Sequence, residues 1–291
     1  MVLEAYRVEF KPTGKYWFTW YLLKAIEGKT GCFTATLDMG LTRREVCISG
    51  GSLVVESFEL RLSDVAPSEE DRVVVVEENG SAYEVLRHTE EGFYKLKAID
   101  LDKAPTLEIN GIHMHRISGV NPWTDTMLKL KAARIRRGLV VLDTCMGLGY
   151  TAIGSVLRGA STVYTFEVDK NVVWIAERNP WSKMLASKAV SMFLGDVTEL
   201  VYKLPSEYFH RVIHDPPRFT KSTGNLYSLE FYSELYRVLK PGGVLFHYTG
   251  EPRIHGPSLL KGIKNRLEKS GFKVLFYDEK ARGFVALKPL S

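Results

Sequence analysis

The stretch Leu139–Ile153, which reads LVVLDTCMGLGYTAI, constrains the fold of this chain more than any other. A β-branched apolar run ends at Asp143, passes through a turn containing Gly147 and Gly149, and continues into small and apolar residues typical of a helix. In a parallel α/β sheet, such a strand–turn–helix unit forms a nucleotide-binding site. We therefore predict a parallel sheet with a nucleotide site at this turn.

The sequence after this turn keeps alternating between strand-like and helix-like segments, which indicates βαβ units. Strands are predicted at 139–143, 162–167, up to about 195, 211–214 and 244–248, and helices at about 150–158, 170–178 and 227–239. The last two strands, 272–276 and 284–287, are separated by too few residues for a crossover helix. We expect them to form an antiparallel hairpin, so the predicted fold class is α/β.

Residues 1–110 are predicted to form a small β-rich domain. One hairpin joins 46–49 to 52–55 through Gly50-Gly51, because glycine tolerates the positive φ of such turns. A second hairpin joins 73–76 to 83–86, and a further strand is expected at 93–96. The apolar stretch 16–26 suits a buried helix or a strand, and a helix is favoured.

Residues 111–137 are predicted to connect this β-rich domain to a third region, 138–291. Asn121-Pro122 is expected to begin a helix, since proline fits the first helical turn. The end of this helix is basic, and the favoured interpretation is a solvated helix C-terminus, with nucleic-acid contact as the alternative. The basic residues are Lys129, Lys131, Arg134, Arg136 and Arg137.

Composition limits the function classes only weakly. The chain holds 45% hydrophobic and 25% charged residues, and no apolar run is long enough to span a membrane, so a globular, cytoplasmic protein is expected. Three scattered cysteines predict reduced thiols and no structural metal. The net charge of +5 is compatible with a polyanionic partner and equally with an ordinary basic enzyme.

Acidic side chains follow the predicted strands after the glycine turn. Glu167 lies 20 residues after Gly147, at the offset where an acid binds a ribose diol. Asp196 ends the next strand and is a candidate acceptor for an adenine amine. Alternatively, Glu167 is a surface acid at the end of a strand. Asp169 lies two residues further on and is expected to be a helix N-cap.

The motifs VLDTCMGLGYTA, YTFEVD, LGDV, HDPPR and LKPGGVLF, in this order, resemble those of class I S-adenosylmethionine-dependent methyltransferases. The resemblance covers about 139–288, half the chain, and implies a Rossmann-like methyltransferase sheet with S-adenosylmethionine as cofactor. The family usually has glycine where this chain has Cys145, so the first turn residue carries a side chain near the cofactor. The implied cofactor-binding residues are Asp143, Cys145, Gly147, Gly149, Glu167 and Asp196.

Asp215-Pro216-Pro217 follows the predicted fourth strand, where a substrate would meet the cofactor. Two prolines remove two amide donors, which leaves the Asp215 carboxylate and the Pro216 carbonyl as acceptors suited to an amine. The motif resembles the D/N-P-P-Y/F/W motif of methyltransferases that act on exocyclic amines, and that resemblance makes Asp215, Pro216 and Pro217 the catalytic residues. A tight turn with a salt-bridged Asp215 is the structural alternative.

Three residues are expected to bind substrate. Arg218 stands where the family has a stacking aromatic, and a guanidinium can stack on a base and pair with phosphate. Phe219 follows it. His115 shares a strand face with His113, a spacing that suits substrate or metal contact, although exposed or internally bonded histidines are the more common case.

The pattern predicts methyl transfer to an exocyclic amine of an RNA base, with the β-rich domain helping to dock RNA. It resembles a family of predicted archaeal methyltransferases, and the narrower expectation is the N4 amine of cytidine in ribosomal RNA, with adenine N6 also possible. The alternatives are an aminopropyltransferase of polyamine synthesis, a small-molecule N-methyltransferase and a non-catalytic RNA-binding protein. No oligomeric state is predicted.

Overall fold

The computed structural model describes residues 3–250 and 252–290, and the chain folds into two compact units. The first unit comprises residues 1–10, 125–170 and 185–291, and the second comprises 11–124 and 171–184. The chain therefore passes from one unit to the other four times. This division differs from the expected continuous segments 1–110, 111–137 and 138–291, because each unit takes in a piece of chain that sequence order assigns elsewhere.

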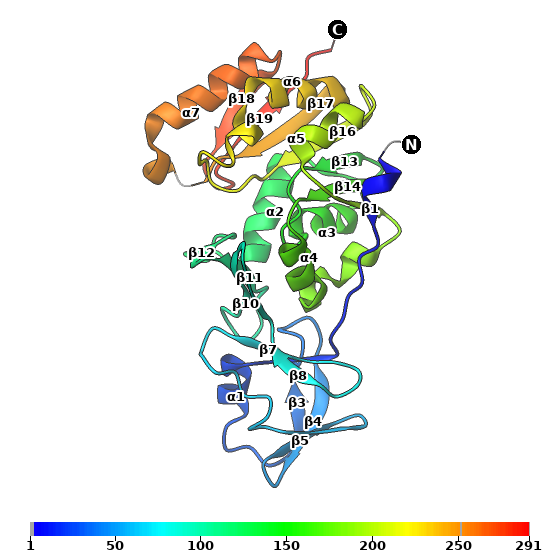
Figure 1. The fold of residues 1–291 in the computed structure, drawn as a ribbon, viewed down its shortest axis with the longest axis vertical. Helices are drawn as coiled ribbons and strands as arrows, with labels where there is room; N and C mark the ends of the chain where they lie inside the picture. Colours follow the sequence, from blue (N-terminus) through cyan, green and yellow to red (C-terminus); the bar gives the residue numbers. More distant parts are fainter. Residues whose placement is uncertain (1–2, 251, 291) are drawn as a thin grey trace. The chain divides into compact units, whose positions relative to one another are not determined.

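The first unit is built on one eight-stranded sheet (Figure 1). Its strand order is β1 (Arg7–Val8), β15 (Val190–Leu194), β14 (Thr162–Glu167), β13 (Val140–Asp143), β16 (Phe209–His214), β17 (Leu239–Tyr248), β19 (Gly283–Leu287) and β18 (Lys273–Asp278). The five strands from β15 to β17 run parallel, whereas β1, β19 and β18 each run antiparallel to a neighbour. The predicted α/β fold with a C-terminal antiparallel hairpin is confirmed.

The chain reverses its direction of travel through this sheet between β13 and β16. It runs from β13 outward through β14 and β15, then returns to place β16 on the other side of β13. In open α/β sheets, ligands bind beyond the carboxyl ends of the strands at such a switch point. The predicted site residues Asp143 and Asp215 follow or end these two strands.

The helices of the first unit are α3 (Tyr150–Leu157), α5 (Val197–Leu200), α6 (Leu229–Val238) and α7 (Pro252–Lys269), whereas α4 (Lys170–Glu177) belongs to the second unit from residue 171 onward. Residues 125–132 of α2 (Pro122–Ala132) also belong to the first unit. Leu235 of α6 and Ile263 of α7 join Leu245 of β17 in one buried core, so burial of an apolar face holds both helices to the sheet. The helix α7 was not predicted.

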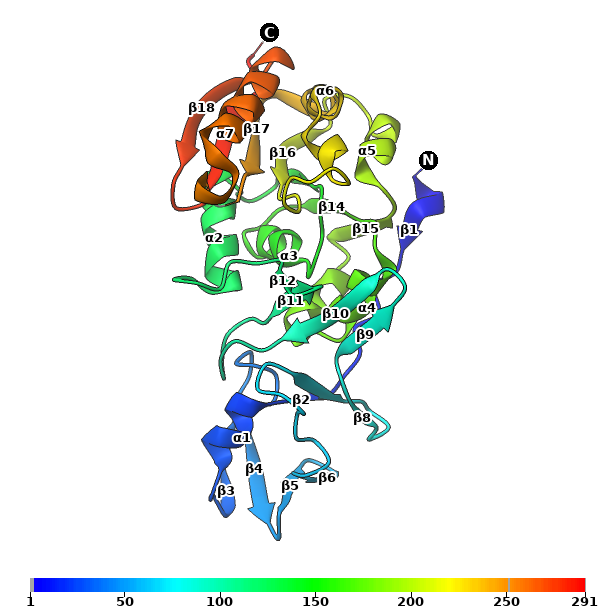
Figure 2. The same cartoon turned by 60° about the vertical axis from the view of Figure 1, so that its left-hand side comes forward.

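The second unit contains three small antiparallel sheets (Figure 2). The first has the order β2 (Tyr16–Thr19), β7 (Val73–Val76) and β8 (Ala82–Glu84); the second β3 (Gly31–Ala35), β4 (Arg44–Ser49), β5 (Ser52–Val55) and β6 (Phe58–Arg61); the third β12 (Ile112–His113), β11 (Thr106–Ile109), β10 (Gly92–Lys97) and β9 (Leu86–Thr89). Both predicted hairpins and the strand near 93–96 are confirmed. Gly50 and Gly51 have φ values of 58° and 79°, as the turn requires.

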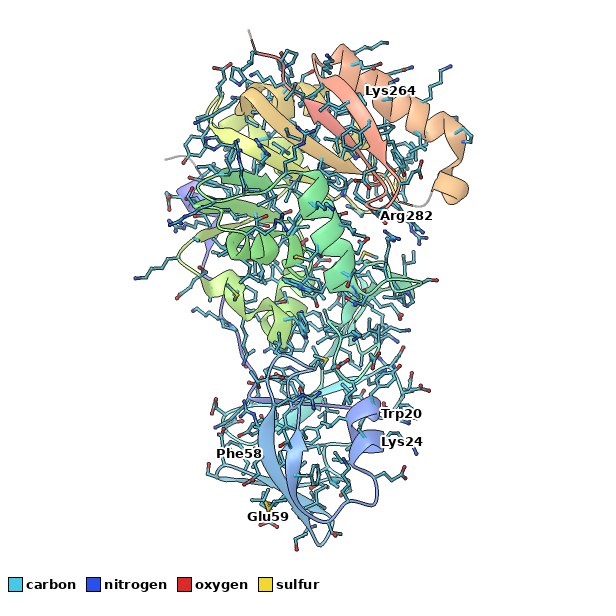
Figure 3. All side chains as sticks on the ribbon, turned by 180° about the vertical axis from the view of Figure 1, so that it is seen from behind. Trp20, Lys24, Phe58, Glu59, Lys264 and Arg282 are labelled. Atoms are coloured by element: carbon cyan, nitrogen blue, oxygen red, sulfur yellow. A yellow bond between two sulfur atoms is a disulfide. The ribbon has the colours of Figure 1, made fainter. Side chains whose placement is uncertain are left out.

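The apolar stretch 16–26 is a strand followed by a helix, not the single helix favoured above. Its first four residues are fully buried as β2, and α1 (Trp20–Ile26) begins only after Thr19, whose Oγ1 accepts a hydrogen bond from the Leu22 amide at 3.1 Å. This N-cap sets the boundary. In Figure 3, Trp20 and Lys24 lie on α1.

The prediction that every cysteine is a reduced thiol was wrong, because Cys32 and Cys47 form a disulfide. The two residues are cross-strand partners in the β3–β4 pair, and their Cα atoms are 4.0 Å apart. Composition gives no sign of this, since the pairing depends on the register of two strands. Cys145 is the one free cysteine in the described part of the chain.

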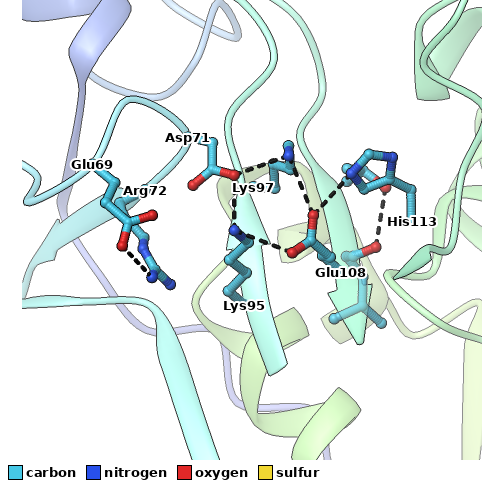
Figure 4. A network of polar contacts seen from close by, with 9 residues as sticks. Glu69, Asp71, Arg72, Lys95, Lys97, Glu108 and His113 are labelled. Carbon is cyan, nitrogen blue, oxygen red and sulfur yellow. Dashed lines mark hydrogen bonds and ion pairs between the residues drawn. The ribbon is translucent and has the colours of Figure 1, made fainter. Parts of the chain in front are cut away.

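A closed ionic network fastens the third sheet of the second unit (Figure 4). The ammonium groups of Lys95 and Lys97 each lie within 3.2 Å of carboxylate oxygens of both Asp71 and Glu108. His113 Nε2 lies 2.8 Å from Glu108 Oε2, so this histidine is engaged within the network. Two cations thus balance two carboxylates in a largely buried position.

Among the described residues, no helix is long and apolar enough to cross a membrane.

Candidate active site

The turn after β13 contains two glycines with positive φ and different surroundings. Gly147 has a φ of 54°, and a Cβ added there would meet no atom within 4 Å. Gly149 has a φ of 77°, caps the N-terminus of α3, and a Cβ there would lie 2.5 Å from Leu185 Cδ1. Gly149 is therefore required for packing, whereas Gly147 borders open space at the position predicted for the cofactor.

Glu167, at the end of β14, is hydrogen-bonded to this turn. Its Oε2 accepts a hydrogen bond from the Gly147 amide at 3.0 Å, and its Oε1 accepts from the amides of Val168 and Asp169 at 2.9 and 3.0 Å. Burial raises the pKa of Glu167 to about 7, although these amide bonds favour the ionised form. The structure thus brings together Gly147 and Glu167, which the sequence predicted to share a site.

Asp143, the predicted partner of the cofactor amine, lies fully buried beneath the turn. Its Oδ1 accepts from Thr151 Oγ1 at 2.9 Å and its Oδ2 from Thr165 Oγ1 at 2.7 Å. Burial raises the pKa of Asp143 to about 7. Through these bonds Asp143 fastens β13 to α3 and β14, and direct contact with a cofactor stays a prediction.

The other two predicted cofactor residues lie at the same edge of the sheet. Asp196 follows β15 and caps α5, because its Oδ1 accepts from both the amide and the hydroxyl of Thr198 at 2.8 Å. Cys145 follows Thr144 in the turn, and burial raises the pKa of its thiol well above the usual value. A raised pKa disfavours the nucleophilic thiolate at neutral pH, and contact of Cys145 with a cofactor stays a prediction.

Asp215-Pro216-Pro217 leaves the sheet directly after β16, next to the glycine turn. The Thr144 amide donates to the Ile213 carbonyl at 3.1 Å, which links the two segments. Tyr227 Oη donates to the Pro217 carbonyl at 2.7 Å and fixes the path of the turn. The side chain of Asp215 keeps 19% of its surface exposed, so the carboxylate borders solvent.

The predicted substrate-binding residues fall into two groups. Arg218 and Phe219 follow the Pro-Pro turn with exposed side chains, and the Phe219 ring packs edge-to-face on Tyr227 at 5.3 Å between ring centres. His115 belongs to the second unit, where its Nδ1 lies 3.0 Å from Thr106 Oγ1. A substrate contact by His115 stays a prediction.

Two buried histidines lie behind the Asp-Pro-Pro turn, a feature that the sequence interpretation missed. The rings of His214 and His247 are 4.5 Å apart, and burial lowers the pKa of His247 to about 4 and that of His214 well below its usual value. Neutral His214 bonds Thr144 Oγ1 through Nδ1 at 2.7 Å and the Leu226 carbonyl through Nε2 at 2.9 Å. It therefore ties the glycine turn to the segment that carries Tyr227.

Lys129 is the functional candidate that sequence reasoning placed wrongly. The solvated helix face expected for it is contradicted, since only 3% of the residue is exposed. Its Nζ lies 2.7 Å from Asp215 Oδ2 and 3.0 Å from Asp125 Oδ2. The i, i+4 spacing of Asp125 and Lys129 was the signal available in the sequence.

The residues at this edge fit an adenosyl cofactor. Open space lies beside Gly147, and carboxylates stand at the ends of β14 and β15, where the diol and the base of a nucleoside bind in sheets of this kind. The turn also precedes α3, whose N-terminus carries a partial positive charge.

Comparison with known proteins assigns the chain to a family. It is 48% identical over 200 residues to the uncharacterized protein MJ1233 of Methanocaldococcus jannaschii, a match that covers 68% of each chain. The chain belongs to the family of this archaeal protein. No family model matches the chain.

Two further relatives carry names that describe an activity. The polyamine aminopropyltransferase of Thermoplasma volcanium is 31% identical over 134 residues, which cover 45% of this chain and 46% of that protein. The ribosomal RNA large subunit methyltransferase I of Yersinia pseudotuberculosis is 25% identical over 128 residues, which cover 42% of this chain and 32% of that protein. The chain thus spans less than half the length of either.

Solved structures confirm the fold. Spermidine synthase from Thermotoga maritima has a TM-score of 0.51 with 17% identity, and the match covers 74% of this chain and 77% of that one. This likeness shows that the chain has the Rossmann-like fold of that protein. The fold and the one methyltransferase relative named above imply S-adenosylmethionine as the cofactor.

Proposed function

We propose that this protein transfers a methyl group from S-adenosylmethionine to an exocyclic amine of an RNA base. The observation that carries the proposal is the position of Asp215-Pro216-Pro217, an acceptor-only turn directly after β16 and joined to the glycine turn through Thr144. The methyltransferase relative acts on ribosomal RNA by name, and the net charge of +5 suits a polyanionic substrate. The narrower proposal is the N4 amine of cytidine in ribosomal RNA, with adenine N6 as the other candidate base.

The mechanism assigned to this chain is mainly positioning. When bound, S-adenosylmethionine supplies an electrophilic methyl group on a sulfonium. Asp215 and the Pro216 carbonyl accept the two hydrogens of the substrate amine, which aims the nitrogen lone pair along the line of displacement. Asp215 then takes the proton that the nitrogen loses. We propose that Arg218 and Phe219, whose side chains are exposed, stack on the base and contact phosphate.

Labelled methyl transfer tests the proposal directly. Purified protein with methyl-labelled S-adenosylmethionine and unmodified ribosomal RNA should yield a methylated nucleoside, identified by mass spectrometry after digestion. Transfer to protein or small molecules alone would contradict it. The same nucleoside should be missing from total RNA of a deletion strain.

Asp215→Ala provides the matched test of the site. We expect the rate of transfer to fall at least 100-fold, because the amine loses an acceptor and the proton loses its base. Cofactor affinity measured by calorimetry should change less than threefold, since Lys129 keeps Asp125 as a partner and the glycine turn is untouched. Equal losses of cofactor binding and rate would assign Asp215 to the cofactor instead.

Aminopropyl transfer to a polyamine is the second candidate. It is supported by the named relative from Thermoplasma volcanium and by the spermidine synthase fold match, which extends over about three quarters of this chain. Turnover of decarboxylated S-adenosylmethionine with putrescine or spermidine would establish it.

A further inference from the structure

The carboxylate of Asp215 is already paired in the folded protein. Lys129 reaches it from α2 at 2.7 Å, and the same ammonium lies 3.0 Å from Asp125 and 4.0 Å from the centre of the Tyr248 ring. The side chains of Lys129 and Asp125 are 4% and 2% exposed, whereas that of Asp215 is 19% exposed. The cation is thus enclosed, and only the carboxylate borders solvent.

The neighbours of Lys129 also determine its protonation state. Burial lowers the pKa of Lys129, but its two carboxylate neighbours outweigh burial and raise this pKa above its usual value, which favours the ammonium form. Lys129 engages Oδ2 of Asp215, which leaves Oδ1 as the oxygen that can accept a hydrogen from a substrate. A lysine held on three sides in this way also orients the carboxylate.

The Lys129–Asp215 ion pair affects which substrate amines can bind, according to the charge of the amine. A protonated alkylamine gains little from a carboxylate that already has a cation, and it meets a fixed positive charge a few ångströms away in a poorly solvated position. A neutral amine, such as the exocyclic amine of a nucleobase, needs only a hydrogen-bond acceptor. The ion pair therefore discriminates between acceptors by charge.

We propose that Lys129 is a positioning residue that makes the Asp215 site select neutral aryl amines over protonated alkylamines. This inference rests on the proposed function, since it names the substrate class of the same site. The inference predicts that the site accepts the neutral amine of a nucleobase and rejects a protonated polyamine. Because polyamine binding can be measured without methyl transfer, the inference can be tested separately from the proposed function.

Four variants separate the charge of Lys129 from its packing. Lys129→Met removes the ammonium and leaves two neighbouring carboxylates, whereas Lys129→Arg keeps the charge. The double variant Asp125→Asn with Lys129→Met removes one charge of each sign, so the cluster keeps the net charge of the wild type. Lys131→Met is the matched control, because this residue lies on the exposed side of the same helix.

The first measurement is RNA methylation between pH 6 and pH 9. In Lys129→Met, kcat at pH 7 should fall at least tenfold with KM for RNA within threefold, and the acid limb of the profile should move up by at least one pH unit. Like charges raise a carboxyl pKa, and besides Lys129 the titratable groups that interact with Asp215 are Asp125, Asp143, Cys145 and Tyr227. In the double variant and in Lys129→Arg, the acid limb of the pH profile should lie closer to that of the wild type than it does in Lys129→Met. The profile of Lys131→Met should match that of the wild type.

The second measurement needs no catalysis. Equilibrium dialysis with labelled spermidine, in the presence of S-adenosylhomocysteine, should show no binding at this site in the wild type and a gain of at least tenfold in affinity in Lys129→Met. The double variant also lacks the cation but has one carboxylate fewer, so it should show a smaller gain than Lys129→Met. Spermidine binding by the wild type in competition with RNA would overturn the inference, as would a Lys129→Met protein with an unmoved acid limb and no gain in spermidine binding.

The two measurements also distinguish the two proposals. If the wild type methylates no RNA, the proposed function fails while the spermidine experiment still decides the role of Lys129. If the wild type methylates RNA and also binds spermidine at the site, the function stands and the charge discrimination fails. Thermal denaturation of each variant identifies any that is unfolded, and the double variant retains the net charge should Lys129→Met alone not fold.

Discussion

Gly147 and Gly149 share a positive φ, yet substitution at each should have a different effect. Alanine at either position costs about 1–2 kcal/mol of backbone strain. At Gly147 the new methyl group enters open space beside Glu167, where the cofactor is proposed to lie. At Gly149 it collides with Leu185, which belongs to the apolar packing of the unit.

We therefore predict that Gly147→Ala weakens binding of S-adenosylhomocysteine at least tenfold, measured by calorimetry, with a small decrease in melting temperature. Gly149→Ala should instead reduce the melting temperature more than Gly147→Ala does. A Gly147→Ala protein with unchanged affinity would place the cofactor away from this turn.

At the scale of elements, the disulfide between β3 and β4 closes a loop with a sequence separation of 15 residues. In the chain-entropy model, a loop of this length gives about 3 kcal/mol of stabilisation. We predict that replacing Cys32 and Cys47 together by serine lowers the free energy of unfolding of the second unit by about that amount.

Calorimetric unfolding with and without reductant checks this prediction, since reduction of the wild type should reproduce the double variant. Cys145→Ser serves as the control, because Cys145 lies in the other unit and forms no disulfide. Equal unfolding with and without reductant would mean that the pair contributes no stability.

The elements that sequence predicted best are those whose apolar period is uninterrupted. The strand 162–167 and the helix starting near residue 170 were placed to within a residue, because buried β-branched runs and an amphipathic helix have clear patterns. The helix α7 was missed because Pro257 and Gly262 interrupt its pattern and normally indicate a loop. The length of β17, which begins at Leu239, was missed for a similar reason, since Pro241, Gly242 and Gly243 lie inside it.

The candidate site was predictable where chemistry is local and not where it depends on distant partners. The Gly147–Glu167 contact follows from strand ends that meet at one sheet edge, a rule that needs no coordinates. The Lys129–Asp215 pair joins residues that are 86 positions apart, and nothing in the sequence reveals that α2 brings them together. Burial reversed the interpretation of Lys129 from a solvent-facing cation to an enclosed one.

At the scale of the whole molecule, two sets of buried groups make stability depend on pH in opposite directions. The pKa of Asp143 and of Glu167 is raised to about 7, so the folded protein binds more protons than the unfolded chain between about pH 4 and 7. The stability from these acids is present below about pH 4 and is lost as the pH rises through 7. The pKa of His247 is lowered to about 4, so its contribution is instead lost as the pH falls below about 6.5.

Asp143→Asn isolates one of these contributions. We predict that the free energy of unfolding of the variant minus that of the wild type increases by about 1 kcal/mol or more between pH 5 and pH 8. Urea denaturation at several pH values in this range measures the difference. A difference that does not vary with pH would show that Asp143 titrates normally.

The four passages of the chain between its two units have a consequence for how such a protein changes over evolutionary time. The second unit is made of 11–124 and 171–184, and its smaller segment contributes anchors such as the Arg178 carbonyl, which accepts from Trp17 Nε1 at 2.6 Å. A single recombination break cannot exchange one unit for another, because it would separate a segment from the partners that bury it. New substrate recognition in this family is therefore expected to arise by substitution within each unit rather than by shuffling of modules.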